Sequence, residues 1–394
     1  MVPNKFTSLI LSLFCVMLGL AACTGSPVEK APVADLPSKP AEDSKAGEIL
    51  RLASFESLPG WGQDDLRDAW PAFMASCEVL NKKNDWKELC QVARDVNAKD
   101  SQAIRVFFEA FFLPYQVINP DGTETGLATG YYEPLLQGAR KRGGKFQTPL
   151  HRVPEDMLVI DLAGVYPELK GMRLRGKLVG NRVVPYASRG ELMQTNSLAG
   201  KEILWVDDPI EALFLQIQGS GRVQLSDTKE TVRVAYADQN GHPYKSVGRY
   251  LIDKGEMKLD QASAQGIKAW AKANPTRLAE LLAANPSYIF FKEEKISAFD
   301  KGPKGALGVP LTPQRSIAVD PQYIPLGVPV FLSTNWPGNS RQLERLVMAQ
   351  DTGSAIKSPV RADFFWGYGQ EPGEKAGKMK QRARMWVLLP RPAS

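Results

Sequence analysis

Residues 346–369 read LVMAQDTGSAIKSPVRADFFWGYG, and this stretch decides the fold and the chemistry that we expect. The apolar run Leu346–Ala349 predicts a buried strand, which leads to Asp351 and a Thr-Gly turn. Asp363 follows twelve residues later beside the aromatic run Phe364–Trp366, an apolar setting that favours the protonated carboxyl group. Two carboxyl groups in unlike surroundings indicate acid–base catalysis, with Asp351 and Asp363 as candidate catalytic residues.

The motif around Asp351 permits a second interpretation. Asp-Thr-Gly after an apolar strand is also typical of aspartic proteases, whose mechanism needs two such carboxylates that share one proton. The chain contains a single Asp-Thr-Gly. A protease would therefore require a homodimer or a degenerate second motif.

Composition and charge narrow the function classes. The chain has 394 residues, which is enough for two ordinary domains. Its formal net charge of +6 falls to +5 without residues 1–22, and Lys and Arg cluster only at 140–145 and 375–384, which argues against a nucleic-acid partner. His151 and His242 have no second ligand nearby in sequence, so we expect no metal site and no cofactor.

The N-terminus has the pattern of an export signal. Lys5 precedes the apolar run Leu9–Leu20, which is too short for a membrane span. The signal ends Leu-Ala-Ala-Cys23, which resembles the lipobox of bacterial lipoproteins, in which the Cys is acylated; the alternative is an ordinary cleavage site. Thr24 follows the Cys, and the absence of Asp at this position resembles lipoproteins sorted to the outer membrane. We therefore expect a signal peptide at 1–22 and a lipidated, disordered tether at 23–48.

Two cysteines remain in the folded part of an exported chain. Cys77 and Cys90 lie on neighbouring segments of helical pattern, and an oxidising compartment favours a disulfide between them. The alternative is a pair of free buried thiols.

The chain changes character twice. Apolar residues at helical spacing predict helices at 64–82, 86–96 and 100–113, whereas strand patterns begin near Gly126 and return from 316 onward. We therefore expect a mainly β fold with a helical N-terminal part and a barrel-like domain interrupted by a second β-rich domain. The expected boundaries are 49–139 for the helices and the first part of the barrel, 140–285 for the inserted domain and 286–394 for the rest of the barrel.

A cleft between these domains is the natural place for a ligand. The predicted helix 208–218 ends at Gln218-Gly219-Ser220, a polar loop that can hydrogen-bond a ligand, although a plain helix-capping turn is an equal alternative. We expect Tyr131 and Tyr132 to line the wall opposite this loop. The candidate substrate-binding residues are Thr129, Tyr131, Tyr132, Gln218, Gly219, Ser220 and Trp366.

Several motifs together resemble one known family. Ala318-Val319-Asp320-Pro321, Ala349–Lys357 and Arg361-Ala362-Asp363 are similar to the three-aspartate C-terminal domain of the membrane-bound lytic murein transglycosylase A family. The resemblance covers most of the mature chain, since further similar motifs are Gly130–Pro134, Gln216–Gly221, Asn240–Tyr244 and Asn285–Tyr288.

This resemblance implies a double-ψ β-barrel that carries the three aspartates, a smaller second β-rich domain and a groove for a glycan strand. It implies Asp363 as the catalytic acid/base and Asp351 as a supporting carboxylate, whereas Asp320 carries the weakest case and on bare sequence caps a turn. Such enzymes cut the β-1,4 bond between N-acetylmuramic acid and N-acetylglucosamine in peptidoglycan and leave a 1,6-anhydro ring. The implied location is the periplasmic face of the outer membrane of a Gram-negative bacterium, and cell-wall synthetic enzymes are partners to test.

Elementary chemistry agrees with a single acid/base. A hydrolase needs a second carboxylate for water or for a covalent intermediate, whereas an intramolecular C6 hydroxyl has an effective concentration on the order of 10⁵ M or more. Two other classes stay open: a glycosidase that uses Asp351 and Asp363 together, and a non-catalytic lipoprotein that binds peptidoglycan. The sequence leaves open whether cutting is at chain ends or internal.

Overall fold

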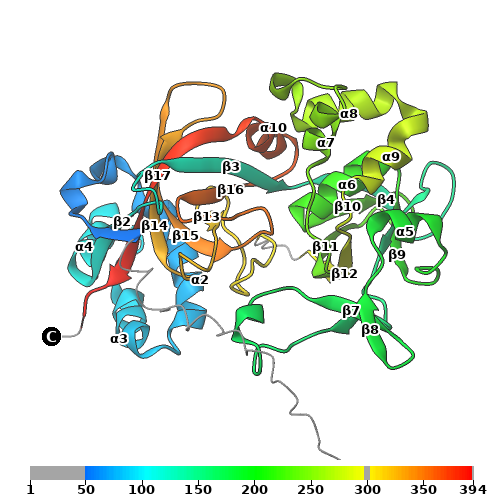
Figure 1. Cartoon of the computed structure of the whole chain (residues 1–394). Coiled ribbons are helices and arrows are strands. Elements are labelled where there is room, and N and C mark those ends of the chain that lie inside the picture. Colours follow the sequence, from blue (N-terminus) through cyan, green and yellow to red (C-terminus); the bar gives the residue numbers. More distant parts are fainter. Residues whose placement is uncertain (1–48, 297–301, 393–394) are drawn as a thin grey trace, which may run out of the picture. The chain divides into compact units, whose positions relative to one another are not determined.

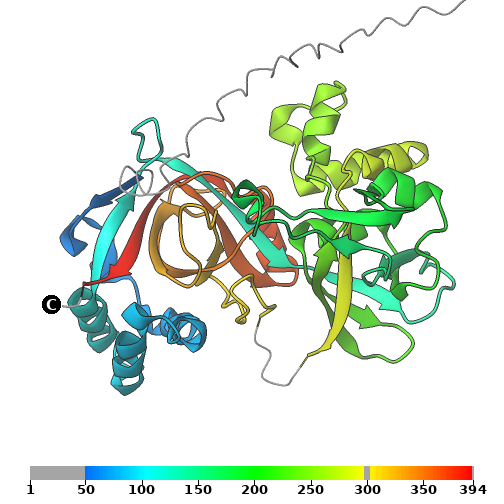
Figure 2. The same ribbon diagram turned by 60° about the horizontal axis from the view of Figure 1, so that its bottom comes forward.

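Six strands close into a barrel: one lies at residues 126–133 and the other five lie after residue 315. The structure is a computed structural model that describes residues 49–296 and 302–392. The barrel strands follow one another in the order β17-β14-β15-β13-β16-β3, and β3 pairs with β17 to close the ring (Figure 2). Their bounds are β3 Gly126–Glu133, β13 Ser316–Ala318, β14 Pro329–Asn335, β15 Gln342–Asp351, β16 Arg361–Tyr368 and β17 Lys380–Pro390. The predicted mainly β fold with a barrel is confirmed.

Alternation along β16 separates a core face from an outer face. Ala362, Phe364 and Trp366 are buried among the apolar residues of the barrel core. Asp363 and Phe365 lie between them in the sequence and therefore face outward. The barrel thus presents every second residue of this strand to whatever packs outside it.

The N-terminal part adds two strands and three helices to one side of the barrel (Figure 1). A bidentate ion pair between Asp64 and Arg315, at 2.7 and 2.8 Å, joins this part to the barrel. The bounds are β1 Leu50–Leu52, β2 Phe112–Val117, α2 Trp70–Leu80, α3 Asn84–Val92 and α4 Ser101–Phe111, with 3-10 turns at Phe55–Ser57, Trp61–Gln63, Leu66–Asp68 and Ala93–Asp95. The helix expected from residue 64 begins only at Trp70.

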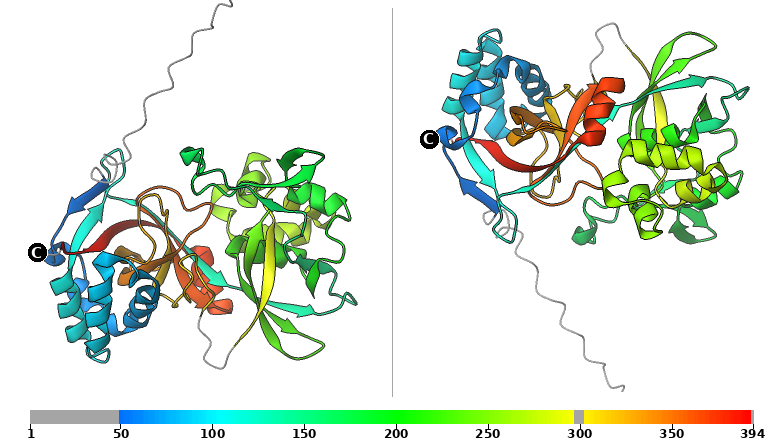
Figure 3. Two further views of the ribbon diagram at one scale, coloured as in Figure 1. Left: turned by 90° about the horizontal axis from the view of Figure 1, so that it is seen from below. Right: turned by 90° about the horizontal axis from the view of Figure 1, so that it is seen from above.

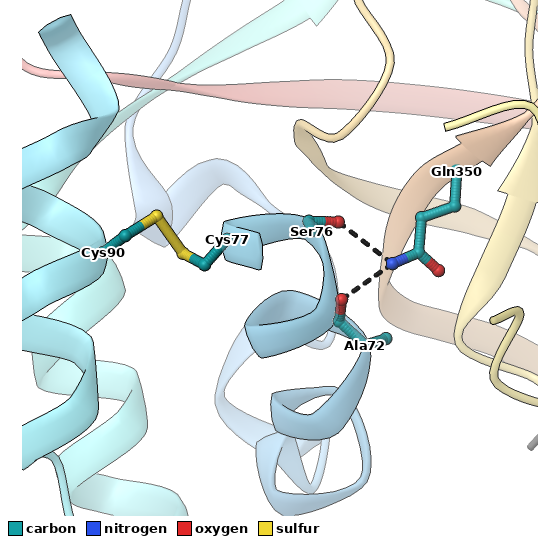
Figure 4. Close-up of a disulfide and its surroundings, with 5 residues drawn as sticks. All are labelled: Ala72, Ser76, Cys77, Cys90 and Gln350. Atoms are coloured by element: carbon teal, nitrogen blue, oxygen red, sulfur yellow. Dashed lines mark hydrogen bonds between the residues drawn. A yellow bond between two sulfur atoms is a disulfide. The ribbon is translucent and has the colours of Figure 1, made fainter. Parts of the chain in front are cut away.

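A disulfide joins α2 to α3 (Figure 4). It links Cys77 to Cys90. On the other side of α2, the amide nitrogen of Gln350 donates to the carbonyl of Ala72 at 2.7 Å and to the hydroxyl of Ser76 at 3.0 Å. The residue before Asp351 is therefore fixed to a helix that is itself cross-linked.

A second sheet of six strands lies in the chain between β3 and β13. Its order is β12-β11-β10-β4-β9-β5, and β4 follows β3 after a single residue, so the chain passes directly from barrel to sheet (Figure 3). The strands are β4 Leu135–Ala139, β5 Thr148–His151, β9 Glu202–Val206, β10 Gly221–Leu225, β11 Thr231–Gln239 and β12 Ile289–Lys295. The associated helices are α5 Arg189–Gln194, α6 Pro209–Gln218, α7 Val247–Asp253, α8 Ala264–Ala273 and α9 Leu278–Ala283, with 3-10 turns at Leu259–Gln261 and Pro275–Arg277.

Helix α6 begins and ends as its sequence predicts. The side chain of Asp208 accepts from the backbone N–H groups of Ile210 and Glu211, and Pro209 occupies the first turn. Gly219 ends the helix with φ of 84°, a left-handed conformation that suits glycine. This end lies beside β3, since the side-chain oxygen of Gln218 accepts from the N–H of Tyr132 at 3.1 Å.

A small third sheet and helix α10 lie outside the barrel and the second sheet. A small antiparallel sheet contains β6 Leu158–Val159, β7 Arg175–Val179 and β8 Arg182–Pro185, with a 3-10 turn at Pro167–Leu169 before β7. Helix α10, Gln370–Lys378, packs against β3 and β16. All described residues belong to one compact unit, residues 43–394, and within them no helix is long and apolar enough to cross a membrane.

Candidate active site

Four adjacent strands place a short row of side chains on one outer face of the barrel. Ala318 of β13 pairs with Asp351 of β15 on one side and with Asp363 of β16 on the other. Asp363 in turn pairs with Thr129 of β3. Because directly paired residues project to the same face, the row reads Asp351, Ala318, Asp363, Thr129. The small side chain of Ala318 leaves space between the two acids.

Asp363 is held by one hydroxyl group. The Thr129 hydroxyl donates to its Oδ1 at 2.6 Å, and Arg361 Nη2 donates to the same Thr129 oxygen at 2.8 Å. Burial raises the pKa of Asp363 above its ordinary value, and the Thr129 hydrogen bond and the positive charge of Arg361 oppose this only in part. A raised pKa keeps a proton on this carboxyl group at a pH where an exposed aspartate would have lost it.

Asp351 has a richer set of donors. Its Oδ1 accepts from the N–H groups of Ala306 and Thr352, both at 2.9 Å, and its Oδ2 accepts from the hydroxyl of Tyr131 at 3.0 Å. Burial raises the pKa of Asp351, these three donors lower it, and the charge of Asp363 raises it again. The net shift in the pKa of Asp351 is upward, as it is for Asp363, but three donors to the charged form oppose it in place of one.

A cavity of about 310 Å³ opens in front of this row. The barrel contributes Thr129, Tyr131, Asp351 and Asp363, and the loop after Asp351 contributes Thr352 to Ile356. The second sheet and its helices supply a largely polar wall that consists of Arg173, Arg189, Gln216, Gln218, Tyr236, Gln239, Tyr244, Asn285 and Ser287. The two acids therefore face a wall rich in hydrogen-bonding groups, which suits a polar ligand such as a sugar.

Most of the predicted binding residues lie at this cavity. Thr129, Tyr131, Gln218 and Gly219 line it. Ser220 lines a neighbouring cavity of about 320 Å³ that shares Tyr131 and Asp351 with the first. Tyr132 lines neither of these but a third cavity, beside α6 and α10.

Two details of the prediction need correction. Trp366 is only 2% exposed and packs in the barrel core against Phe364 and Trp336, because β16 alternates and Trp366 falls on the inner face. Tyr132 does not lie opposite the Gln218 loop, since Gln218 hydrogen-bonds directly to its backbone, whereas Tyr131 is on the barrel side of the cavity.

Asp320 lies outside the cavity. It is 3% exposed in the turn after β13, where Oδ1 accepts from Gln322 N–H and Oδ2 from Ser358 N–H, both at 3.2 Å. The carboxylate thus joins its own turn to the loop that follows Asp351, as expected of a turn-capping residue.

Three cationic residues at this site, Arg173, Arg189 and Arg361, were not expected from the sequence. Arg361 lies two residues before Asp363, and period-two alternation places it on the same face of the strand. Arg189 is buried, and its guanidinium donates to the carbonyls of Asn285 and Ser287 and to the side chain of Gln216. No sequence periodicity indicates Arg189, because its partners come from distant segments. Within residues 49–296 and 302–392, no group of three or more His, Cys, Asp or Glu is placed to hold a metal ion.

Comparison with known protein families gives two matches that agree with this geometry. Residues 127–292 match the model of the MltA specific insert domain, and residues 315–389 match the model of the 3D domain. The first match contains the second sheet except the end of β12, and the second contains Ala318, Asp351 and Asp363.

Individual relatives point to the same family. The chain is 33% identical over 273 residues to membrane-bound lytic murein transglycosylase A of Escherichia coli strain K12, which covers 68% of this chain and 66% of that protein. The crystal structure of MltA from Neisseria gonorrhoeae is 40% identical with a TM-score of 0.75, over 88% of this chain and 93% of the other. The structure of E. coli MltA with bound chitohexaose is 27% identical with a TM-score of 0.65, over 87% and 95%.

Proposed function

The chain belongs to the membrane-bound lytic murein transglycosylase A family, and from this premise we propose that it is a peptidoglycan lytic transglycosylase in which Asp363 is the single acid/base. The bond that it cuts is the β-1,4 bond from N-acetylmuramic acid to N-acetylglucosamine, and the product carries a 1,6-anhydromuramic end. The observation that carries the proposal is the buried, hydroxyl-bonded carboxyl group of Asp363 in a polar-walled cavity.

Asp363 performs two steps in turn. The protonated carboxyl group donates its proton to the glycosidic oxygen as the bond from the anomeric carbon to that oxygen breaks. The resulting carboxylate then accepts the proton of the C6 hydroxyl as that oxygen bonds to the anomeric carbon. Atoms balance without water, and Asp363 ends protonated, ready for the next turnover. Burial raises the pKa of Asp363, which supports the first step.

Asp351 supports the reaction as a carboxyl group that three donors hold in place. Three donors already occupy its oxygens, so it has little capacity left to bind and deprotonate a water molecule. Its carboxyl group lies across Ala318 from Asp363, close to where positive charge develops on the sugar ring. This distinguishes the proposal from a glycosidase, in which Asp351 would have to activate water or attack the sugar.

The binding surface is built for a neutral or anionic glycan. Chitohexaose, which E. coli MltA binds, is a chain of N-acetylated sugars. Thr129, Tyr131, Gln218 and Gly219 at the cavity, with Ser220 beside it, offer hydroxyl, amide and backbone groups of the kind that recognise such sugars.

The finer architecture belongs to the proposal as well. We assign the barrel a double-ψ topology that is interrupted by an inserted domain. The expected bounds of 140–285 for this domain are a few residues too narrow at each end, because β4 and β12 belong to the second sheet. Closure of the barrel by β3 from one part and β16 and β17 from the other supports this division. The lipid-anchored location rests on Leu20-Ala21-Ala22-Cys23, which lies outside the described residues: acylated Cys23 would hold the chain at the periplasmic face of the outer membrane.

The test is the chemical identity of the products from purified sacculi. The proposal predicts soluble muropeptides with 1,6-anhydro ends, each lighter by one water than the hydrolysis product. Reducing ends would indicate the glycosidase instead. Failure to release any soluble fragment, with the protein still bound to sacculi, would indicate a non-catalytic binding lipoprotein.

A further inference from the structure

One segment, whose Arg173 lines the cavity, concentrates exposed apolar side chains. Fifteen large hydrophobic residues are exposed in the described chain, and nine of them lie between residues 158 and 183. They are Leu158, Val159, Leu162, Val165, Tyr166, Met172, Leu178, Val179 and Val183. This segment comprises β6, β7, β8 and the loop before β7, and we call it the apolar ribbon. Exposed apolar patches of this kind mark contacts with other molecules.

The tip of the β7–β8 hairpin is apolar on both of its faces. Leu178 and Val183 form a cross-strand pair and share one face, with 61% and 50% of their surfaces exposed. Val179 alternates to the other face and is 53% exposed. The loop before β7 adds Val165, which is 74% exposed. In Figure 1, β7 and β8 lie at the lower edge of the chain.

Cationic side chains accompany these apolar ones. Lys170 and Arg182 are exposed, and neither forms an ion pair within the described part of the chain. Residues 158–185 contain five Lys and Arg but only two acids, Asp161 and Glu168. Arg175 is already neutralised by Asp238 at 2.9 Å. Arg173 lines the cavity, so Lys170, Lys177 and Arg182 remain against the two acids, and the ribbon keeps a small net positive charge.

We propose that the apolar ribbon is a membrane-contact element, which inserts its hairpin tip and the loop before β7 into the surface of an anionic phospholipid bilayer. A rigid protein partner covers one face of a hairpin, whereas a fluid bilayer surrounds a tip and buries both faces at once. Long cationic side chains beside the apolar residues can reach the anionic headgroups while their stems stay in the interface. This contact would act in addition to the lipid proposed at Cys23, and it does not depend on the catalytic role of Asp363.

The experiment uses a soluble form that begins at residue 24, which keeps every described strand, helix and core cluster of the compact unit. Flotation with vesicles measures its partition onto phosphatidylglycerol-rich membranes and onto neutral phosphatidylcholine membranes. We expect binding to the anionic vesicles that weakens with salt. The variant Val165→Asp/Val179→Asp should bind about tenfold less, because it places charges where apolar side chains enter the interface.

Matched controls make the outcome decisive. Leu259→Asp replaces an equally exposed apolar residue, 69% exposed, outside the ribbon and should bind as the wild type does. Turnover of soluble glycan strands should be the same in all variants. The proposal is overturned if the wild type does not float with anionic vesicles, if Leu259→Asp lowers binding as much as the ribbon variant, or if the ribbon variant instead dissolves a dimer in solution.

Discussion

Two acidic side chains at β3, Glu133 and Asp363, differ in whether a cation is paired with them. Glu133, at the end of β3, is 1% exposed and accepts from Arg222 Nε at 2.9 Å and from Arg233 Nε at 2.5 Å. Asp363 pairs with β3 four residues earlier and is partly buried, with burial raising its pKa, yet no cation lies within ion-pair distance of it in the described chain. The first acid joins the barrel strand to the second sheet; the second has only a hydroxyl partner.

Burial of an acidic side chain therefore has two different consequences in this molecule. The two guanidinium groups that bond Glu133 fix the position of β10 and β11 against β3. A buried carboxyl group without such a partner lowers its free energy by keeping its proton, and a retained proton is what an acid catalyst needs. The same residue chemistry therefore serves structure at one end of the strand and catalysis at the other.

The largest effect is expected for the substitution Asp363→Asn. An amide of the same shape can accept the Thr129 hydrogen bond but cannot donate and then recover a proton. We expect release of 1,6-anhydro muropeptides to fall by about 10²-fold or more, while folding and sacculus binding persist. Initial rates, circular dichroism and pelleting with sacculi measure the three properties.

An exposed acid serves as the control for this substitution. Asp253 forms a surface ion pair with Arg249 far from the cavity, so Asp253→Asn should turn over at the wild-type rate. Near-normal release by Asp363→Asn would show that the proton comes from another group.

Glu133→Gln should have the converse effect. It leaves two buried guanidinium groups without their shared charge, and breaking a buried ion pair costs on the order of 3–5 kcal/mol. Denaturant unfolding should show this loss of stability, and the folded fraction should keep its catalytic rate. As a control, Glu124→Gln removes an exposed partner of Arg51 and should change stability little. The comparison fails if Glu133→Gln is as stable as the wild type.

Asp351→Asn tests the division of labour between the two acids. The amide oxygen can still accept some of the hydrogen bonds from Tyr131, Ala306 and Thr352, so we expect a fall in rate of roughly tenfold, the value of one such interaction. The products should keep their anhydro ends. A loss larger than that of Asp363→Asn would reverse the assignment of the two residues.

The smallest expected effect is on stability as a function of pH. The pKa of Asp363 is raised in the folded chain, so its contribution to stability is fully present below the unfolded pKa of about 3.9 and is lost as pH rises through the folded pKa. Asp363→Asn has no such loss. The variant should therefore gain stability relative to the wild type as pH rises, measured by denaturant unfolding at a series of pH values. The opposite trend would mean that Asp363 is stabilised as a carboxylate.

Much of the fold follows from local sequence. Asp208, Pro209 and Gly219 bound α6 as capping rules predict, and the apolar run before Asp351 forms β15. Pairing between distant segments does not follow from local patterns. Nothing near Asp64 indicates that its carboxylate receives Arg315, an ion pair that holds the region before α2 in short turns instead of the expected longer helix.

The sequence predicts a site residue when its own neighbours identify it, and does not when distant strands bring it to the site. Asp351 and Asp363 follow from their own neighbours, but their common partner Ala318 becomes evident only when β13 lies between β15 and β16. Trp366 shows the limit of reading neighbours alone: it is three residues from Asp363, and strand alternation turns it to the opposite face.

In this mechanism Asp363 keeps a proton because no cation is paired with it. Titration of its carboxyl carbon measures this directly. Carbon-13 NMR of the aspartate-labelled, unliganded chain, with the signal identified by its absence in Asp363→Asn, gives the midpoint. The account predicts a midpoint clearly above the ordinary aspartate value of about 3.9. A midpoint at or below that value would contradict it.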